Sequence, residues 1–451
     1  MTESSPSTLK QPTARGVELT SEVAREGLLH AKRPTSLPLA PKAPVARRKL
    51  PLAAESRPID RAWRPIYAVW EITLKCDLAC RHCGSRAGKA RSDELSTEQC
   101  FDLIEQMAEL GVKEVTIIGG EAYLRPDWLD IVRKIRDVGM QSTMTTGGRG
   151  ITPEHARAAR EAGLMSVSVS VDGLEETHDR LRGVTGSFQS AMAAIAAFRA
   201  AGVPVSANTQ INRLSAREMP ELLERLIVAG IHGWQLQLTV PMGRAVDEPD
   251  VLLQPYDLLK IFPMVAELKR RTVEARVTLW PGNNLGYFGP YESLLRGSMP
   301  EGHLGSCGAG RGTLGIEADG TIKGCPSLPT REFAGGNVLD NRLVDIWERA
   351  EALRFTRDRQ VPRDLWGYCA TCYYADTCRA GCTWTGFTAL GKAGNNPYCH
   401  HRALEFERIG KRERLVLASP APGEPFDHGR FDLIEEDIPS SSLSLETASP
   451  S

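Results

Sequence analysis

Three cysteines lie close together near the first strand-like segment of the chain. In the stretch EITLKCDLACRHCGSRAG (71–88), Cys76, Cys80 and Cys83 are spaced CxxxCxxC after an apolar, β-branched run. Three thiolates at this spacing can bind three irons of a [4Fe-4S] cubane and leave the fourth iron free of protein. A structural zinc would need a fourth ligand, and His82, adjacent to Cys83, is poorly placed to provide it. The spacing therefore favours a cluster with an open iron that can bind a substrate.

A second group of cysteines lies between residues 307 and 399. Cys307 precedes GAGRGTLGIEADGTIKG and Cys325, and the chain later reads CATCYYADTCRAGC and NNPYCHH. These seven thiols are too many for one zinc and an odd number for disulfides. Two iron–sulfur sites fit this number better, and a zinc-ribbon-like fold is the structural alternative. The group indicates a second metal-binding region.

The composition favours metal ligation over disulfides. The chain has 451 residues, and 55 lysines and arginines nearly balance 56 aspartates and glutamates, so no overall field attracts nucleic acid or an anionic membrane. The first residues lack a signal-like apolar core, and no run is long enough to span a bilayer. We therefore expect a cytoplasmic protein without nucleic-acid or membrane partners, in a compartment that disfavours stable disulfides. The isolated Cys100 is expected to be a small buried hydrophobe in a helix.

Strand and helix signals alternate through the middle of the chain. Each strand-like segment is followed by a polar loop and a helix-like stretch, such as the one that opens with a Ser/Thr cap near residue 96 and ends at Gly111. Repeated β-then-α units predict a parallel sheet with helices outside, and chemistry gathers at the carboxyl ends of its strands. The three clustered cysteines follow the first strand and so belong to that end. The strand-like segments are 67–76, 114–120, 141–147, 165–173, 203–212 and 233–241.

These signals predict an α/β protein with a partial (β/α)6 TIM-like barrel, a small Cys-rich domain and disordered termini. We expect a basic arm rich in Pro and Ser over 1–60, the barrel core over 65–290, and a tail over 420–451. The Cys-rich region, 300–405, has short Gly- and Pro-rich pieces and one helix-like stretch, so we expect metal rather than a large core to organise it.

The first cysteine group resembles the radical S-adenosylmethionine (SAM) superfamily. The family pattern is CxxxCxΦC after the first strand of a part-barrel, where Φ is usually aromatic and His82 stands here. The resemblance implies that Cys76, Cys80 and Cys83 hold a [4Fe-4S] cluster to which SAM binds. One electron from the reduced cluster would cleave SAM into methionine and a 5′-deoxyadenosyl radical, which abstracts hydrogen from an unactivated carbon.

Further segments resemble the SAM-contacting parts of that family. IIGGEAYLRPDW resembles its GGE loop, so the resemblance places Gly119, Gly120 and Glu121 at the SAM amino group, with Ala122 where relatives often have proline. TTGGR resembles the loop that often reads TNG in relatives. SVSVDGLEETHDRLRG resembles the fourth-strand segment of peptide-modifying members. The cofactor contacts that the resemblance implies are His82, Gly119, Gly120, Glu121, Ser170 and Arg182, the last pairing with the SAM carboxylate.

The second cysteine group resembles the SPASM domain, the auxiliary-cluster module of radical SAM enzymes that modify peptides and proteins. The resemblance implies one auxiliary cluster on Cys369, Cys372, Cys378 and Cys399. It implies another on Cys307, Cys325 and Cys382, where relatives often carry one more upstream cysteine. Glu301, His303, solvent or substrate are the alternatives for that fourth position. The two resemblances cover roughly residues 65–405.

The resemblances imply a cytoplasmic radical SAM maturase that modifies a peptide or protein, with an electron donor such as flavodoxin or ferredoxin. Formylglycine formation of the anaerobic sulfatase-maturase type and radical decarboxylation of a small molecule such as a tetrapyrrole are the enzymatic alternatives. A non-catalytic electron carrier or a zinc-stabilised binding module is the alternative of another class. No general base is evident. Polar residues at strand ends that could line a pocket are Asn208, Gln210, Gln237, Arg244, Asn283 and Asn284.

Overall fold

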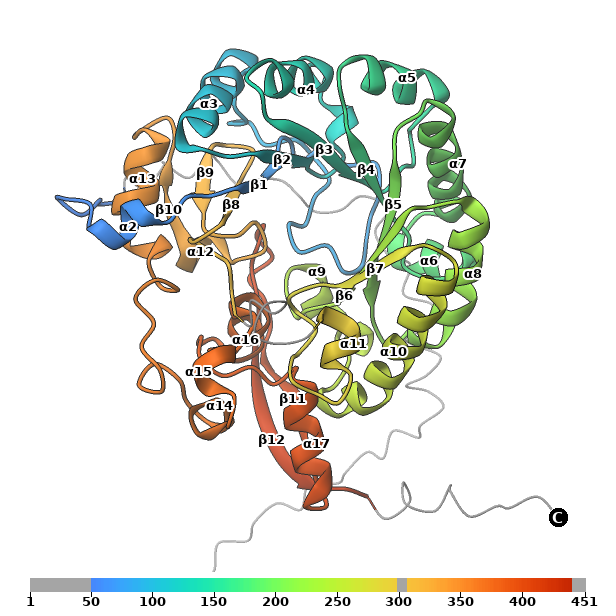
Figure 1. The fold of residues 1–451 in the computed structure, drawn as a ribbon, viewed down its shortest axis with the longest axis vertical. Helices are drawn as coiled ribbons and strands as arrows, with labels where there is room; N and C mark the ends of the chain where they lie inside the picture. The colour runs from blue at the N-terminus through green and yellow to red at the C-terminus, as the bar shows by residue number, and fades with distance from the viewer. Residues whose placement is uncertain (1–49, 298–305, 440–451) are drawn as a thin grey trace, which may run out of the picture. The chain divides into compact units, whose positions relative to one another are not determined.

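A single curved sheet carries both cysteine-rich regions (Figure 1). The computed structural model describes residues 50–297 and 306–439. The sheet has ten strands in the order β10-β9-β8-β1-β2-β3-β4-β5-β6-β7, and it does not close. Its strands are β1 (Tyr67–Glu71), β2 (Glu114–Ile118), β3 (Gln141–Thr146), β4 (Ser166–Ser170), β5 (Val205–Ile211), β6 (Gly233–Leu238), β7 (Thr278–Pro281), β8 (Thr313–Ile316), β9 (Thr321–Lys323) and β10 (Ala334–Asn337).

The strands β8 and β1 to β7 all run parallel, and β9 and β10 are antiparallel to their neighbours. The predicted partial barrel is confirmed, and the sheet extends it at both edges. The seventh strand, β7, is short and ends in Pro281, so its sequence signal is weak. At the other edge, β8 pairs with β1 in the register Tyr67↔Thr313. The Cys-rich region therefore continues the barrel sheet as well as following it in sequence.

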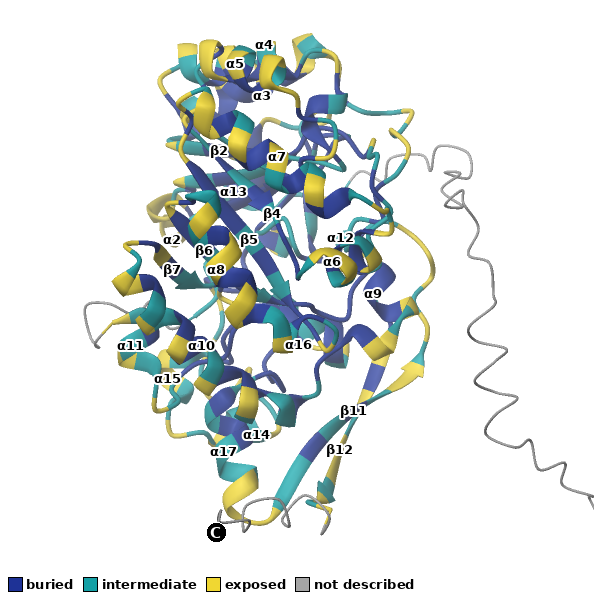
Figure 2. Cartoon of the chain, turned by 90° about the vertical axis from the view of Figure 1, so that its right-hand side faces the viewer, coloured by how far each residue is buried: buried dark blue, intermediate teal, exposed yellow. Residues whose placement is uncertain are grey.

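Helices on the outer side of the sheet cover it (Figure 1). They begin and end as their sequences indicate: Ser96 accepts a hydrogen bond from the Gln99 N–H at the start of α3, and Gly111, at φ 99°, ends it. Figure 2 shows the buried residues along the strands and the exposed ones on the outer helix faces. Cys100, on α3, is buried as predicted. These helices are α3 (Thr97–Leu110), α4 (Trp128–Asp137), α5 (Pro153–Glu161), α7 (Ser187–Ala200), α8 (Met219–Ala229) and α10 (Leu258–Glu274). The segments that follow β4, β6 and β7 contain α6 (Glu175–Arg182), α9 (Arg244–Asp247) and α11 (Glu292–Arg296).

The carboxyl-terminal third consists mainly of short helices around the cysteines. Among the described residues, no helix is long and apolar enough to cross a membrane. The helices of this part are α12 (Thr330–Phe333), α13 (Leu343–Arg349), α14 (Tyr368–Thr371), α15 (Ala375–Cys378), α16 (Thr383–Leu390) and α17 (His400–Arg408). Single 3₁₀ turns occupy Ala122–Leu124, Ala216–Glu218, Pro249–Val251, Pro255–Asp257 and Glu351–Leu353.

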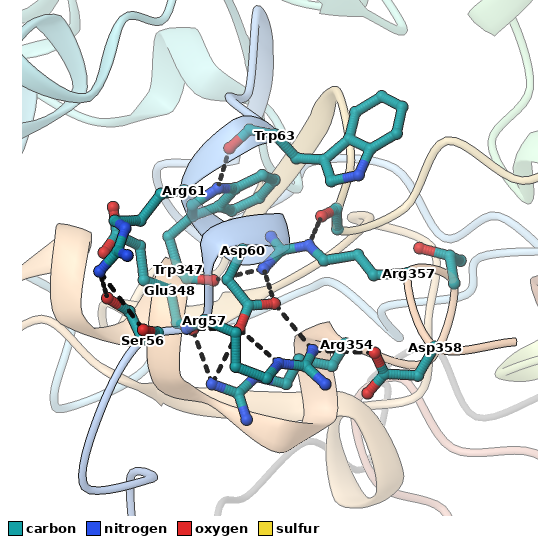
Figure 3. Close-up of polar contacts among 12 residues, drawn as sticks. Ser56, Arg57, Asp60, Arg61, Trp63, Trp347, Glu348, Arg354, Arg357 and Asp358 are labelled. Atoms are coloured by element: carbon teal, nitrogen blue, oxygen red, sulfur yellow. Dashed lines mark hydrogen bonds and ion pairs between the residues drawn. The ribbon is translucent and has the colours of Figure 1, made fainter.

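The expected disordered arm is ordered in its last part. Residues 50–60 are described; α2 (Pro58–Ala62) contacts α13, and its buried Asp60 faces arginines that follow α13 (Figure 3). Its carboxylate pairs with Arg57 at 2.8 Å, Arg354 at 3.0 Å and Arg357 at 3.2 Å. Burial alone would raise the pKa of Asp60, but the hydrogen bonds from Arg57 and Arg357 lower it to about 2. The prediction of disorder is therefore wrong for residues 50–60, and residues 1–49 lie outside the described residues.

The expected disordered tail is also wrong over its first part. Residues 411–437 form an antiparallel hairpin of β11 (Lys411–Ser419) and β12 (Arg430–Asp437). α17 packs on β11, and α16 packs on β12. Phe431 is buried at the start of β12, which anchors this strand to the rest of the molecule. The acid-rich sequence of β12 concealed the strand, and residues 440–451 lie outside the described residues.

Candidate functional site

The loop after β1, residues 72–88, holds the first three cysteines at the carboxyl end of the sheet, and we call it the cluster loop. The Cys76 N–H donates to the Gly88 carbonyl at 2.9 Å, and the Cys83 carbonyl accepts the Arg244 N–H at 3.1 Å. Burial raises the pKa of the Cys76 thiol and that of Cys80, the latter to about 11, and the neighbouring thiols raise both further. A bound metal stabilises thiolates that would otherwise stay protonated. The three donors thus suit a thiolate-ligated centre.

The end of α6 holds this cluster loop from one side. The Ala79 N–H donates to the Arg182 carbonyl at 3.0 Å, and Arg182 Nη1 approaches the Cys80 Sγ to 3.6 Å. Its Nη2 pairs with the buried Asp172 carboxylate at 2.6 Å. Gly183 follows at φ 70°, where a Cβ would lie 2.5 Å from the Ala79 carbonyl oxygen. Glycine is needed at this close approach.

The same buried Asp172 also engages His82. His82 Nε2 lies 3.0 Å from Asp172 Oδ2, so this nitrogen faces a carboxylate. Burial alone would raise the pKa of Asp172, but the charges of Arg182 and His82 lower it. Among the described residues, His82 Nδ1 and Arg182 Nε are buried without a hydrogen-bond partner. Two unpartnered polar atoms beside the cysteines fit a polar ligand at this place.

The loop after β2, Gly119 to Glu121, lies against the cluster loop. The Glu121 N–H donates to the Lys75 carbonyl at 2.8 Å. A Cβ on Gly120 would lie 2.3 Å from the Lys75 carbonyl oxygen and 2.6 Å from the Cys76 Cβ, and one on Gly119 would meet the Thr73 carbonyl oxygen at 2.5 Å. Only glycine permits this approach of two backbones. The GGE motif therefore fixes the distance between the two loops.

Glu121 brings a buried carboxylate to the cysteines. One of its oxygens lies within 4.8 Å of the Cys76 Sγ. The carboxylate accepts hydrogen bonds from the Thr146 hydroxyl at 2.5 Å and from the Gly147 N–H at 2.6 Å. Burial raises the pKa of Glu121 to about 7, although these two hydrogen bonds lower it. A buried carboxylate with this tendency to take up a proton is suited to an ammonium ligand.

Packing explains why Gly147 stands in the loop after β3, where relatives often have asparagine. A Cβ on Gly147 would lie 2.4 Å from Leu78 Cδ1 and 2.8 Å from Glu121 Oε1. Leu78 is buried between Cys76 and Cys80 in the cluster loop. Gly147 therefore lets the cluster loop and the Glu121 carboxylate pack against the same backbone.

The strand-end candidates separate into two groups. Ser170 ends β4 beside Asn208 of β5, and the Asn208 Oδ1 is buried without a partner among the described residues. Gln210 and Gln237 lie half-buried near the ends of their strands and remain candidates for a pocket. The other three have structural contacts: Arg244 Nη1 donates to the Cys80 carbonyl at 2.8 Å, Asn284 bonds both backbone groups of Leu238, and Asn283 accepts from Tyr287.

The turn between β11 and β12 also contacts the cluster loop, and the sequence did not reveal this contact. Arg86 pairs with Asp247 at 2.6 Å and with Asp427, in the turn between β11 and β12, at 2.8 Å. The Phe426 N–H donates to the Gly84 carbonyl at 3.1 Å. Because Arg86 and Asp427 are 341 residues apart, no local pattern could have predicted their contact. The hairpin turn thus forms part of the support of the first site.

Electrostatic interactions link the seven distal cysteines in two sets, and the assignment of these sets as the ligands of two centres is our proposal. In the first set, burial raises the pKa of Cys369, Cys378 and Cys399, the last to about 11, and neighbouring thiols raise it further. In the second set, burial and the neighbouring Cys307 raise the pKa of Cys325 to about 12 and that of Cys382 to about 11. The two sets are Cys369, Cys372, Cys378 and Cys399, and Cys307, Cys325 and Cys382.

Arginines surround the three-cysteine set. Burial lowers the pKa of Arg311 and of Arg359, and each is lowered further by the charge of Arg379, while Cys307 acts in the opposite direction on both. Arg311 Nε is buried without a hydrogen-bond partner among the described residues. This positive surrounding suits an anionic thiolate-ligated centre. The expected fourth-ligand candidates, Glu301 and His303, lie outside the described residues.

Two family models match the chain. One, described as the radical SAM superfamily, matches residues 70–226, and the other, an iron–sulfur cluster-binding domain named SPASM, matches residues 307–373. Cys378, Cys382 and Cys399 lie beyond the second match.

Curated relatives are similar over most of their length. An AdoMet-dependent heme synthase of Methanosarcina barkeri is 31% identical over 74% of this chain and 95% of its own. The mycofactocin maturase MftC of Mycobacterium tuberculosis is 33% identical over 82% of this chain and 90% of its own.

Solved structures share the fold. AdoMet-bound anSMEcpe matches with a TM-score of 0.60 at 18% identity, over 76% of this chain and 98% of that one. SAM-bound SuiB of Streptococcus suis matches with a TM-score of 0.57 at 17% identity, over 74% of this chain and 76% of that one.

Proposed function

Because the chain belongs to the radical SAM superfamily and carries a SPASM domain after its barrel, we propose that this enzyme modifies a side chain of a peptide or protein. Its cofactors are a [4Fe-4S] cluster with SAM and auxiliary iron–sulfur clusters. The observation that carries the proposal is the pairing of the SPASM domain with similarity to a peptide maturase over 82% of the chain. The SPASM domain that the second cysteine group resembles occurs mostly in enzymes that act on polypeptides.

Different residues of the first site would bind different parts of the cofactors. Cys76, Cys80 and Cys83 would hold the cluster, and when bound, the cluster and SAM supply a 5′-deoxyadenosyl radical that abstracts hydrogen from the substrate. The buried Glu121 carboxylate would accept the ammonium group of SAM. Arg182, held beside Cys80 by Asp172, offers its unpartnered Nε to the SAM carboxylate.

Ser170, at the end of β4, and the ring of His82 would complete the contacts to SAM. Glu121, His82 and Arg182 are buried, at 3%, 5% and 8% exposure, whereas Ser170 and the three cysteines are half-buried, so bound SAM itself would help to exclude water from the place where the radical forms. The two distal cysteine sets would hold the auxiliary clusters, which can accept the electron left after hydrogen abstraction. A flavodoxin or ferredoxin is our proposal for the reductant.

A second candidate function is decarboxylation of a tetrapyrrole side chain. It is favoured by the similarity to an AdoMet-dependent heme synthase and to an Fe-coproporphyrin III synthase, which is 34% identical over 76% of this chain. The arginines around Cys307 would suit the carboxylates of such a substrate equally well. The maturase proposal takes precedence because MftC matches a larger share of the chain.

A substrate comparison tests the proposal. The anaerobically reconstituted enzyme is reduced and given SAM with either any short peptide encoded beside its gene or Fe-coproporphyrin III, and the products are read by mass spectrometry. We expect a mass change on the peptide that depends on SAM and is absent from Cys80→Ala. Loss of carbon dioxide from the tetrapyrrole, with an unchanged peptide, would establish the second candidate instead.

A further inference from the structure

The hairpin of β11 and β12 exposes one strand edge. β12 pairs with β11 on one side, and α16 contacts it near its start. From Ile434 to Asp437 most side chains are exposed, and the hairpin extends away from the barrel (Figure 2). A two-stranded sheet leaves the outer hydrogen-bonding groups of both strands in need of partners.

The outer edge of β11 is satisfied at Leu415. The Leu415 N–H donates to Gln254 Oε1 at 2.7 Å, and the Leu415 carbonyl accepts from Gln254 Nε2 at 3.2 Å. The side-chain amide of Gln254 thus takes the place of a neighbouring strand. Because the backbone groups of Leu415 point outward, Leu415 and its partner Leu433 form a non-hydrogen-bonded pair of the ladder.

The alternation of hydrogen-bonded and non-hydrogen-bonded pairs then shows which backbone groups of β12 do not bond to β11. The Ile438 N–H donates to the Gly410 carbonyl at 2.9 Å, so this pair is hydrogen-bonded and agrees with the same alternation. The backbone N–H and C=O groups of Leu433, Glu435 and Asp437 consequently point away from β11. Within the described part of the chain, none of the three has a backbone hydrogen bond on this outer side.

The charge of β12 indicates what kind of strand would fit. Lys411 pairs with Glu435, and Arg412 pairs with Glu436 at 2.7 Å across the hairpin. Asp432 and Asp437 are exposed, and their carboxylates form no salt bridge within the described residues. Arg430, at the start of β12, is exposed too and has no salt bridge within the described residues, so the two unpaired acids leave a net negative charge that is concentrated toward the Asp437 end. This charge favours a neighbouring strand with lysine or arginine at alternate positions.

The hairpin also leads toward the first site. β12 begins at Arg430, three residues after Asp427, whose carboxylate pairs with Arg86 of the cluster loop at 2.8 Å. A strand added antiparallel to β12 runs from Asp437 toward Arg430. Its carboxyl end would therefore arrive next to the cluster loop.

We propose that the outer edge of β12 binds an extended, basic segment of the peptide substrate as an antiparallel third strand. This inference rests on the proposed function, since it assigns the docking site of that substrate. The segment downstream of the docked strand would enter the barrel mouth, where the cysteines of the first site lie.

The test blocks the edge without disturbing the hairpin. Glu435→Pro removes an N–H that points outward, so the bonds between β11 and β12 remain. Glu435→Ala is the matched control, because it loses the same contact with Lys411 and keeps the N–H. Formation of 5′-deoxyadenosine without a peptide should be equal in all three proteins, which verifies folding and cluster loading.

A phage-displayed library of random short peptides is the probe. We expect the wild type and Glu435→Ala to enrich peptides with alternating Lys or Arg, and Glu435→Pro to bind them at least tenfold more weakly. Equal binding by all three proteins, or no enrichment, would overturn the inference. A wild-type dimer that dissociates in Glu435→Pro would show that a second copy occupies the edge instead.

The two proposals fail separately. If a genuine peptide substrate is modified as fast by Glu435→Pro as by Glu435→Ala, the docking edge is refuted and the proposed function stands. If library peptides dock on the edge but only the tetrapyrrole is converted, the proposed function is refuted while the edge remains a peptide-binding surface.

Discussion

The packing of Gly147 against the cluster loop leads to a quantitative prediction. In Gly147→Ala the new Cβ would lie 2.4 Å from Leu78 Cδ1 and 2.8 Å from Glu121 Oε1. Carbon atoms in contact are normally about 3.5–4.0 Å apart, so Leu78 or the Glu121 carboxylate has to move by about 1 Å. Overpacking of this kind costs about 1–3 kcal/mol.

This cost should appear in SAM binding. The protein relieves the overlap by displacing the Glu121 carboxylate, or Leu78 and with it the loop that carries the cysteines, and SAM binding must reverse this displacement. At a factor of ten for each 1.4 kcal/mol, the affinity for SAM should fall by roughly 5- to 150-fold. The assay is anaerobic equilibrium dialysis of the reconstituted protein, with iron counted in every sample so that cluster loss is recognised separately.

A double-mutant cycle identifies the cause. Leu78→Ala removes the Cδ1 atom that the new Cβ would meet, so Gly147→Ala should cost much less SAM affinity in the Leu78→Ala background than in the wild type. An equal loss in both backgrounds would refute the packing explanation. So would a Gly147→Ala variant that binds SAM as the wild type does.

Three other contacts give predictions. Asp427→Ala leaves the buried Arg86 with one carboxylate fewer and should lower the free energy of unfolding by about 3 kcal/mol. Amide hydrogen exchange over 76–88 should become faster, and unchanged exchange there would contradict the role of the hairpin turn. Arg182→Lys removes a donor to Cys80 worth about 1 kcal/mol and should lower the reduction potential of the cluster by about 40 mV in an EPR titration without SAM. The pKa of Asp60 is lowered in the folded protein from 3.8 to about 2, so its contribution of about 2 kcal/mol is present above pH 4 and lost as the pH falls toward 2. The difference in urea midpoint between Asp60→Asn and the wild type should accordingly narrow between pH 6 and pH 3, and a constant difference would argue against the ion cluster.

The sequence predicted those parts of the site that depend on local spacing. CxxxCxxC and GGE each place their residues within one loop, and the alternation of apolar residues placed both loops after strands. Glycine spacing also carried information, because Gly119 and Gly120 are needed where two backbones approach. The division of the distal cysteines followed from a family pattern and not from their order in the chain.

The sequence did not predict contacts between distant segments. Nothing near Arg86 or Asp427 indicates that the two side chains meet. The acids of β12 outnumber its apolar residues, so its sequence is typical of a tail; pairing with β11 and burial of Phe431 against the rest of the molecule make it a strand. Likewise, the short arm before β1 is ordered by Asp60, whose arginine partners Arg354 and Arg357 lie almost 300 residues away.

The central claim is radical cleavage of SAM at the first cysteine group, and one anaerobic measurement tests it most directly. The protein is reconstituted with iron and sulfide, reduced and given SAM, and 5′-deoxyadenosine is assayed while iron is counted. We expect 5′-deoxyadenosine with about twelve irons per chain, the sum for three [4Fe-4S] clusters, and none from Cys80→Ala although its distal clusters stay loaded. Cleavage that survives in Cys80→Ala, or a fully loaded and reduced wild type that forms no 5′-deoxyadenosine even with its peptide, would contradict the account.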